Sequence, residues 1–536
     1  MSEKYYSKFD PNYDFSEVDN IVIGSGLGGL TTAVFLAKTG RKVVVLEQHY
    51  VPGGFSHTFK RKDGFVWDVG IHYVGNMGDD SMFLRVSDYL TGGRLKWSDM
   101  GEVYDQLQIN GEKYDFVAGE ENFRKQMHDY FPEHKQEIDE YLRLVKKASK
   151  KSMLFFAQKA MPPFLRFLLG GFFRRSFRKY SRKTTEEVMC SITDNRDLRN
   201  VLCGQCGDYG LAPGKSSFGA HAIIVNHFLN GGYYPEGGAK EIYENMLQEI
   251  VEHGGKIFVR AEVDEILVEK KRTVGVRIGE KVIPCKNVIS NVGVRGTFEK
   301  LIKKEHVPED QFDYKKIQPS HSHYCLYLGL NKSDEQLQLP KYNVWYYDGE
   351  DMDAVLEKIL SREEKELRFA YISFPSAKDP DWVEKHGETS TIQAVGISNM
   401  EWFKEFEDTK WMKRGDAYEA IKQDFEDRML EVLYRIFPQL EGNVAVTEVS
   451  TPLSTKHFTN HSSGEIYGLA HTPERFDLNC LDPKTKIKGL YLCGQDIVTV
   501  GFGGAVASGL LCATHLLQYG MYKEFKSMSR PKEKKG

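Results

Sequence analysis

Cysteine is scarce in this chain, with eight residues scattered over 536. That spread differs from the dense, regular spacing of a secreted domain held together by disulfides. Cys203 and Cys206 have the spacing of a redox or metal pair, but no second pair completes a zinc site and no thioredoxin-like β-α-β unit surrounds them. We therefore expect ordinary reduced cysteines and no metal site, with a redox or metal role for this pair as the alternative.

Long hydrophobic runs are also missing. No stretch of about 18 uncharged apolar residues occurs, so we expect no transmembrane helix. The first residues lack the basic region and apolar run of a signal peptide. The 72 Lys and Arg nearly balance the 76 Asp and Glu, for a net charge of −4, so there is no global basic field to attract nucleic acid. These absences predict a cytoplasmic protein with no nucleic-acid partner.

The stretch from Asn20 to Glu47 contains a complete β-α-β pattern with glycines at its first turn. Gly24 permits the tight turn, Gly26 lets the backbone approach a pyrophosphate, and Gly29 lets helix and strand pack closely. The helix start offers free N–H groups to phosphates. Glu47 follows about 20 residues on, where an acid can bond the ribose hydroxyls. The pattern predicts a nucleotide cofactor.

A second glycine-rich element lies between Gly489 and Ala505. A short apolar strand leads to Gly494 and Asp496, and a helix is expected from Gly504 to Tyr519. Small residues let a flat ligand approach the backbone, and a helix N-terminus stabilises negative charge. A nicotinamide site does not need this element, whereas a reduced flavin ring does. The alternative is an ordinary strand, turn and helix.

Together the two ends resemble the FAD-dependent amine-oxidase and phytoene-desaturase superfamily. Three intermediate stretches match its pattern: 47–54 (EQHYVPGG), 65–75 (FVWDVGIHYVG) and 234–239 (YPEGGA). The Gly-Ile-His-Tyr signature at 70–73 and the segment Phe374–Pro380 look most like the retinol-saturase (all-trans-retinol 13,14-reductase) branch. Plant-type carotene cis-trans isomerases are close cousins. The resemblance covers about residues 20–518.

This resemblance implies an α/β fold, with a Rossmann-like FAD-binding domain and a mixed α+β substrate domain. The FAD domain is expected from residues 1–80, 225–300 and 480–536, and the substrate domain from 81–224 and 301–479. The implied FAD-binding residues are Gly24, Ser25, Gly26, Leu27, Gly28, Gly29, Glu47, Gln48, Gly53, Gly54, Phe55, Ser56, Ile71, His72, Val263, Gly494, Asp496, Gly503, Gly504 and Ala505.

The implied reaction is saturation of a carbon–carbon double bond, which needs reduced flavin, hydride delivery and a proton donor. His72 and Tyr73 are the first candidates for the donor, and Tyr467 with His471 form a second pair. Each could equally be a residue of the fold, as we expect of His221 and His227. Only one dinucleotide fingerprint is present. Electrons therefore come from NAD(P)H bound transiently elsewhere, from another protein or from a quinone.

Residues 153–183 combine Phe and Leu with basic residues and contain no acid, which suits an anionic membrane interface. Pro162–Pro163 and Gly170–Gly171 are expected to break the segment into short helices. The alternative is a cap helix packed on the core. The basic residues are Lys159, Arg166, Arg174, Arg175, Arg178, Lys179, Arg182 and Lys183.

The sequence thus predicts an FAD-dependent oxidoreductase, peripheral on a membrane, that saturates a lipophilic polyene such as a retinoid or carotenoid. The same flavin cradle would serve a redox-neutral carotenoid isomerase or a desaturase. A flavin-binding, membrane-associated protein without turnover is the alternative from another class. An amine oxidase is less favoured, because no residue specifies an amine.

Overall fold

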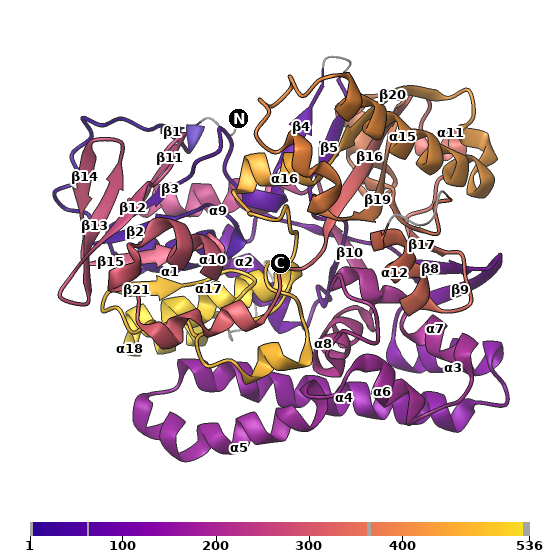
Figure 1. Ribbon diagram of the computed structural model, residues 1–536, viewed down its shortest axis with the longest axis horizontal. Coiled ribbons are helices and arrows are strands. Elements are labelled where there is room, and N and C mark those ends of the chain that lie inside the picture. The colour runs from indigo at the N-terminus through magenta and orange to yellow at the C-terminus, as the bar shows by residue number, and fades with distance from the viewer. Residues whose placement is uncertain (1–3, 62–63, 362–365, 529–536) are drawn as a thin grey trace, which may run out of the picture.

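The computed structural model describes residues 4–61, 64–361 and 366–528. Figure 1 shows two groups of strands side by side, with the N-terminal glycine-rich unit on the left and the strands of residues 322–450 on the upper right. The long helices α4 (Lys135–Ala157) and α5 (Pro163–Ser181) run along the lower edge.

The left-hand group is a six-stranded sheet whose neighbouring strands pair in parallel. Its central strands are wholly buried, as expected for strands covered on both faces. Helix α1 (Leu27–Lys38) packs against α17 (Gly501–Leu517) and α9 (Lys240–Glu252). The strand order is β1 (Ser7–Lys8), β11 (Lys256–Val259), β3 (Val43–Leu46), β2 (Asn20–Ile23), β15 (Asn287–Ser290) and β21 (Leu490–Leu492). The predicted Rossmann-like α/β fold is confirmed.

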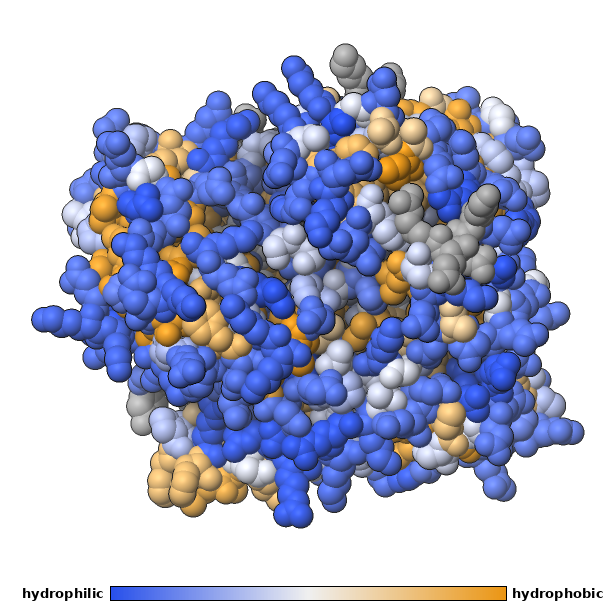
Figure 2. Space-filling model, in the orientation of Figure 1, coloured by the Kyte–Doolittle hydropathy of each residue, from blue (hydrophilic) through white to orange (hydrophobic). Residues whose placement is uncertain are grey.

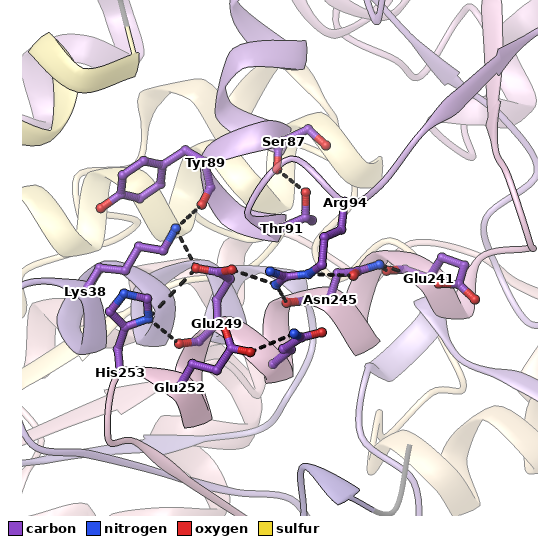
Figure 3. A network of polar contacts seen from close by, with 11 residues as sticks. Lys38, Ser87, Tyr89, Thr91, Arg94, Glu241, Asn245, Glu249, Glu252 and His253 are labelled. Atoms are coloured by element: carbon purple, nitrogen blue, oxygen red, sulfur yellow. Dashed lines mark hydrogen bonds and ion pairs between the residues drawn. The ribbon is translucent and has the colours of Figure 1, made fainter. Parts of the chain in front are cut away.

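A buried carboxylate fastens the far end of α1 to its neighbours (Figure 3). Glu249 of α9 forms ion pairs with Lys38 at 2.7 Å and with Arg94 at 2.6 Å. Lys38 also donates to the backbone carbonyl of Tyr89 in α2 (Met82–Thr91). Although burial opposes ionisation, the hydrogen bonds from Lys38 and Arg94 lower the pKa of Glu249. The network holds α1, α2 and α9 as one unit behind the glycine turn.

The right-hand group is a seven-stranded mixed sheet with two different faces. Alternate residues such as Leu326 and Ile372 pack on α15 (Asp416–Ile436), whereas Cys325 and Tyr371 line an internal cavity. This alternation is the period of two that strands impose on side chains. The order is β20 (Val444–Ser450), β16 (Ser322–Leu330), β19 (Ser390–Ser398), β18 (Phe369–Ser373), β17 (Asn343–Tyr347), β8 (Val103–Ile109) and β9 (Glu112–Val117).

Smaller sheets and helices join these two groups. Among the described residues, the other strands are β4 (Thr58–Lys60), β5 (Val66–Asp68), β6 (Val74–Gly75), β7 (Trp97–Asp99), β10 (Gly232–Pro235), β12 (Glu265–Glu269), β13 (Arg272–Ile278) and β14 (Lys281–Pro284). The other α-helices there are α3 (Glu120–Tyr130), α6 (Thr185–Cys190), α7 (Arg196–Leu202), α8 (Phe218–Phe228), α10 (Gly293–Arg295), α11 (Asp334–Leu337), α12 (Met352–Ser361), α13 (Pro375–Lys378), α14 (Trp382–His386), α16 (Pro452–Thr459) and α18 (Tyr519–Met528).

Two expectations about helices were wrong. Helix α17 begins at Gly501 rather than Gly504, so Gly503 and Gly504 lie in its first turn. Helix α5 continues through Gly170–Gly171, because glycine in a helix costs only about 1 kcal/mol and packing readily offsets that cost. Pro163 starts α5 at a position where no backbone N–H is needed. Across 4–61, 64–361 and 366–528, no helix combines the length and apolar character required to cross a bilayer.

Candidate functional site

A cavity of about 650 Å³ extends from the glycine turn of the six-stranded sheet to the inner face of the seven-stranded sheet. Gly24, Gly26 and Glu47 line its first part. Trp345 and Tyr371 line its second part, on neighbouring strands of the larger sheet. The cavity therefore connects a nucleotide-type cradle to an aromatic chamber.

Two helices begin at the cradle without a side-chain cap. The N-cap residues are Gly26 for α1 and Val500 for α17, and neither makes a side-chain capping bond. Gly28 and Gly501, in the first turns, line the cavity. Uncapped helix starts present free N–H groups and a positive dipole end. The cradle thus fits a ligand that carries negative charge at two places, as the pyrophosphate and the reduced ring of a flavin dinucleotide do.

The two glycine-rich elements touch each other at this point. A Cβ placed on Gly28 would lie 2.7 Å from the backbone nitrogen of Gly494 and 2.7 Å from Oδ1 of Asn291. Gly24 adopts a φ of 89°, which side-chain-bearing residues rarely adopt. Glycine at position 28 therefore lets the two glycine-rich elements pack against each other, which a side chain would prevent.

Glu47 is almost buried at the end of β3 and organises the cradle. One carboxylate oxygen accepts hydrogen bonds from the backbone N–H and the hydroxyl of Ser25, at 2.8 and 2.6 Å. The other accepts from the backbone N–H of His49 at 2.9 Å. The Ser25 hydroxyl in turn accepts from the N–H of Gly53. An ionised carboxylate has about four acceptor sites, so capacity for a ribose hydroxyl remains.

Most residues predicted to bind FAD line the cavity. Ser25, Gly29, Asp496, Gly503 and Gly504 do not. Ser25 and Gly29 support the glycine turn from behind, and a Cβ on Gly29 would lie 2.4 Å from the carbonyl oxygen of Gly24. The lining members are Gly24, Gly26, Leu27, Gly28, Glu47, Gln48, Gly53, Gly54, Phe55, Ser56, Ile71, His72, Val263, Gly494 and Ala505.

Asp496 acts on the fold beside the cradle. Its carboxylate accepts the backbone N–H groups of Val294 and Leu469, both at 2.9 Å. The buried guanidinium of Arg475 donates to the carbonyls of Gln495 and Asp496, at 2.8 and 3.0 Å. These bonds fix the turn that carries Gln495 into the cavity wall.

His72 faces the aromatic chamber, with its ring 5.1 Å from that of Tyr371. Burial, with the nearby Lys378 charge, lowers the pKa of His72 to about 3, so the ring is neutral at pH 7. The buried Nδ1 atoms of His72 and His323 and the hydroxyl of Tyr371 have no hydrogen-bond partner within the described chain. All three residues line the cavity, so these atoms are available to hydrogen-bond a ligand that carries polar atoms.

Tyr73 points away from the cavity. Its ring stacks on Phe228 at 4.1 Å, and its hydroxyl lies 2.9 Å from carboxylate oxygens of both Asp105 and Asp208. The second predicted pair is divided in the same way. Tyr467 lines the cavity, whereas His471 is buried and does not.

Sequence reasoning missed several residues of the chamber: Asp208, His323, Trp345 and Tyr371. Behind the wall, the buried ammonium of Lys378 donates to the carbonyl of His72, to the Asn343 side chain and to the Ser373 hydroxyl. The motif Phe374–Pro380 contains Lys378, so this residue alone had a sequence signal. The others are scattered along the chain.

The remaining candidates lie in the core. All eight cysteines are free, and burial raises the pKa of both Cys203 and Cys206. His221 is fully buried between the hydroxyls of Tyr141 and Tyr209. His227 accepts the backbone N–H of Gly75. In the part of the chain that the structure describes, no three His, Cys, Asp or Glu side chains gather as a metal site.

Comparison with known proteins places this chain in a family. A family model described as flavin containing amine oxidoreductase matches residues 27–517. All-trans-retinol 13,14-reductase of Danio rerio is 35% identical, over 96% of this chain and 88% of its own. An inactive all-trans-retinol 13,14-reductase of the same fish is 33% identical, over 96% and 88%. Prolycopene isomerase 1, chloroplastic, of an Oncidium hybrid cultivar is 26% identical, over 93% and 83%.

Among solved structures, cyclohexylamine oxidase from Brevibacterium oxydans IH-35A matches with a TM-score of 0.62 at 14% identity, over 95% of this chain and 100% of that one. The family match and these relatives, together with the fold and the cradle, define a flavin-dependent oxidoreductase. The chain belongs to the flavin containing amine oxidoreductase family. Within that family it is similar to the all-trans-retinol 13,14-reductases, as its motifs predicted.

Proposed function

We propose that this protein binds FAD in the cradle and saturates a carbon–carbon double bond of a lipophilic polyene, in the manner of the retinol 13,14-reductases. The observation that carries the proposal is the continuous cavity, in which the cradle opens directly onto the aromatic chamber. Bound FAD, once reduced, supplies a hydride. The apolar walls hold the polyene, and the unpartnered His72, His323 and Tyr371 atoms form hydrogen bonds with polar atoms of cofactor or substrate.

A polyene must reach the cavity from a lipid phase, and α5 offers a surface for that contact. Its outward side carries exposed apolar residues, of which Phe167 is 85% exposed. Figure 2 shows hydrophobic side chains gathered at the lower left, where Figure 1 draws α5. The exposed residues on α5 and the preceding end of α4 are Met153, Leu154, Phe164, Leu165, Phe167, Leu168, Leu169 and Phe172.

Basic residues continue this apolar face. Leu168, Phe172, Arg175 and Lys179 are all exposed, and they follow one another along α5 in steps of three or four residues. Residues at that spacing lie on the same side of a helix. Apolar side chains beside cations suit an anionic bilayer surface, where the apolar groups insert and the cations meet the headgroups.

Other cations of the segment serve the fold instead. The buried Lys159 donates to the carbonyls of Leu481 and Ile497, and Arg166 pairs with Asp482 at 2.6 Å. Arg178 and Arg182 both pair with Asp477. A test of membrane contact must therefore spare these residues.

The membrane test uses two double variants, Phe167→Ser with Phe172→Ser and Arg175→Gln with Lys179→Gln, in flotation with anionic vesicles. Removing the two phenyl groups is expected to weaken binding at least tenfold, since full burial of each is worth about 1.5–3 kcal/mol. The matched control is Val282→Ser, which removes a half-exposed apolar side chain from β14, away from α5. Undiminished flotation of the α5 variants would contradict the proposal.

The functional test is anaerobic. The FAD-loaded protein is reduced with dithionite, all-trans-retinol is added, and flavin absorbance and product mass are followed together. Flavin reoxidation with a product heavier by two hydrogens supports a saturase. Flavin that stays reduced beside a product of unchanged mass supports the isomerase alternative, which the isomerase relative motivates. No change in any polyene supports a flavin-binding protein without turnover. The inactive all-trans-retinol 13,14-reductase among the relatives is the reason to test for this class.

The electron donor is tested in the same anaerobic cuvette. NADPH, NADH and a reduced quinone are offered in turn to the oxidised protein, and the bleaching of the flavin band is timed. The fastest donor class is the physiological candidate. Bleaching by none of them would direct the search to a protein donor.

A further inference from the structure

Two acids share one tyrosine hydroxyl beside the chamber. Asp105 of β8 and Asp208, at the end of the short 3-10 helix Gly204–Asp208, each have a carboxylate oxygen 2.9 Å from the hydroxyl of Tyr73. A hydroxyl has one proton, so it can donate to only one of the two at a time. This geometry is typical of two carboxyl groups, here Asp105 and Asp208, that hold one proton between them.

The surroundings of the two acids differ. Asp105 also accepts the side-chain N–H groups of Gln205 at 2.8 Å and Asn343 at 2.9 Å, and it lies in the field of Lys378. Within the described residues, the carboxyl of Asp208 has a single side-chain hydrogen-bond partner, the Tyr73 hydroxyl. Donors stabilise a carboxylate, so Asp105 is the ionised member and Asp208 the protonated one.

The direction of the pKa shifts agrees with this assignment. Burial, followed by the charge of Asp105, raises the pKa of Asp208 well above its ordinary value. Burial raises the pKa of Asp105 only to about 6, because its hydrogen bonds oppose the effect. Tyr104, Tyr371 and Tyr467 also lie in the field of Asp208; the pKa of each, ordinarily about 10, is raised further by burial, so each is neutral at pH 7.

Asp208 also faces the place where a substrate would lie. It lines the cavity together with His72, Trp345 and Tyr371, whereas the fully buried Asp105 and the adjacent Tyr73 stand behind the wall. Tyr371 connects these residues, with its ring 4.4 Å from Trp345 and 5.1 Å from His72. One acid of the pair therefore opens onto the chamber and the other does not.

Resting on the proposed function, we infer that Asp208 is the proton donor for the double bond, and that Tyr73 and Asp105 position it. The π bond would break as one carbon takes a hydride, which bound and reduced FAD would supply, and the other takes the carboxyl proton of Asp208. The products are a saturated bond, oxidised flavin and the Asp208 carboxylate. The Tyr73 hydroxyl turns from Asp105 to this new carboxylate, which later regains a proton from water.

The test uses Asp208→Asn in the FAD-loaded protein, with Asp334→Asn as the matched control. Asp334 is another largely buried acid, bonded to Ser376 and absent from the cavity wall. Asp208→Asn is expected to lower kcat for polyene reduction by about 10²–10⁴-fold, with FAD content and dithionite reduction unchanged. The infrared difference spectrum between wild type and this variant should show the carbonyl band of a protonated acid at neutral pH. The control should keep both the activity and that band.

A second variant guards against a simple folding defect. Asp105→Asn removes the like charge that raises the pKa of Asp208, so the alkaline limb of the pH–kcat profile should move to lower pH. Wild type that reduces no polyene would overturn the proposed function itself. If the wild type is active, three results would each overturn the proton-donor assignment alone. These are full activity of Asp208→Asn, a difference spectrum without the carbonyl band, and an alkaline limb that does not move in Asp105→Asn.

Discussion

Gly28→Ala is the sharpest test of the cradle, because it adds one methyl group at the contact between the two glycine-rich elements. The new Cβ would lie 2.7 Å from the backbone nitrogen of Gly494, closer than such atoms approach in proteins. Neither neighbour is the tip of a flexible side chain that could swing away freely: one is backbone, and the other is the short amide of Asn291. Helix α1 or the Gly494 turn must move.

The cost of such overpacking is about 1–3 kcal/mol. The chain would relieve it by separating the two elements, and FAD bound in the proposed cradle would have to bring them together again. Since 1.4 kcal/mol is a factor of ten in affinity, the Kd for FAD should rise roughly 5- to 150-fold. The measurement is a titration of apoprotein with FAD, followed by flavin fluorescence.

Gly171→Ala is the matched control, because a Cβ at Gly171 in α5 meets no atom within 4 Å. It should leave the Kd for FAD unchanged and raise stability slightly, as alanine favours a helix over glycine. Gly28→Ala that binds FAD as tightly as the wild type would refute the cradle.

Two further predictions concern buried groups. Lys378→Met leaves the acceptors on Asn343 and Ser373 without their donor. The free energy of unfolding should therefore fall by about 1–3 kcal/mol per acceptor, as measured by denaturant titration. An unchanged denaturation midpoint would contradict this. His221→Gln tests acid sensitivity. Burial lowers the pKa of His221 to about 3, so the unfolded chain binds a proton first and wild-type stability falls as pH drops below 6.5. At pH 5 the buried, neutral His221 lowers the free energy of unfolding of the wild type by ~2 kcal/mol. Between pH 7 and 5, the free energy of unfolding of His221→Gln should therefore fall by ~2 kcal/mol less than that of the wild type.

The cradle could be predicted because its residues are neighbours in the sequence. Gly24, Gly28 and Glu47 lie within one β-α-β unit, where strand, turn and helix fix their relative places. The start of α17 was wrong by one turn, since three glycines do not mark which of them begins the helix. The unbroken α5 was also missed, because packing outweighs the small penalty of Gly170–Gly171.

The chamber could not be predicted in the same way. Tyr73 and Asp208 are 135 residues apart, and Asp105 and Asn343 are 238 apart. Only the parallel pairing of β8 with β17 brings Asp105 beside Asn343. No local sequence pattern shows that Asp105 and Asp208 form a pair. The pair can be recognised only from the long-range packing of the folded chain.

This division explains why the motifs identify a cofactor more readily than a reaction. Saturation, desaturation and isomerisation can share one flavin cradle, but they differ in whether the reaction consumes a proton. A saturase must supply one net proton in each turnover, whereas a redox-neutral isomerase returns any proton that it uses. On the proton-donor assignment proposed for Asp208, the reaction is decided in the aromatic chamber, at this acid and the Tyr73 hydroxyl that it shares with Asp105. If Asp208→Asn stops saturation yet still permits cis-trans isomerisation on reduced flavin, then a single carboxyl separates the two activities in this fold.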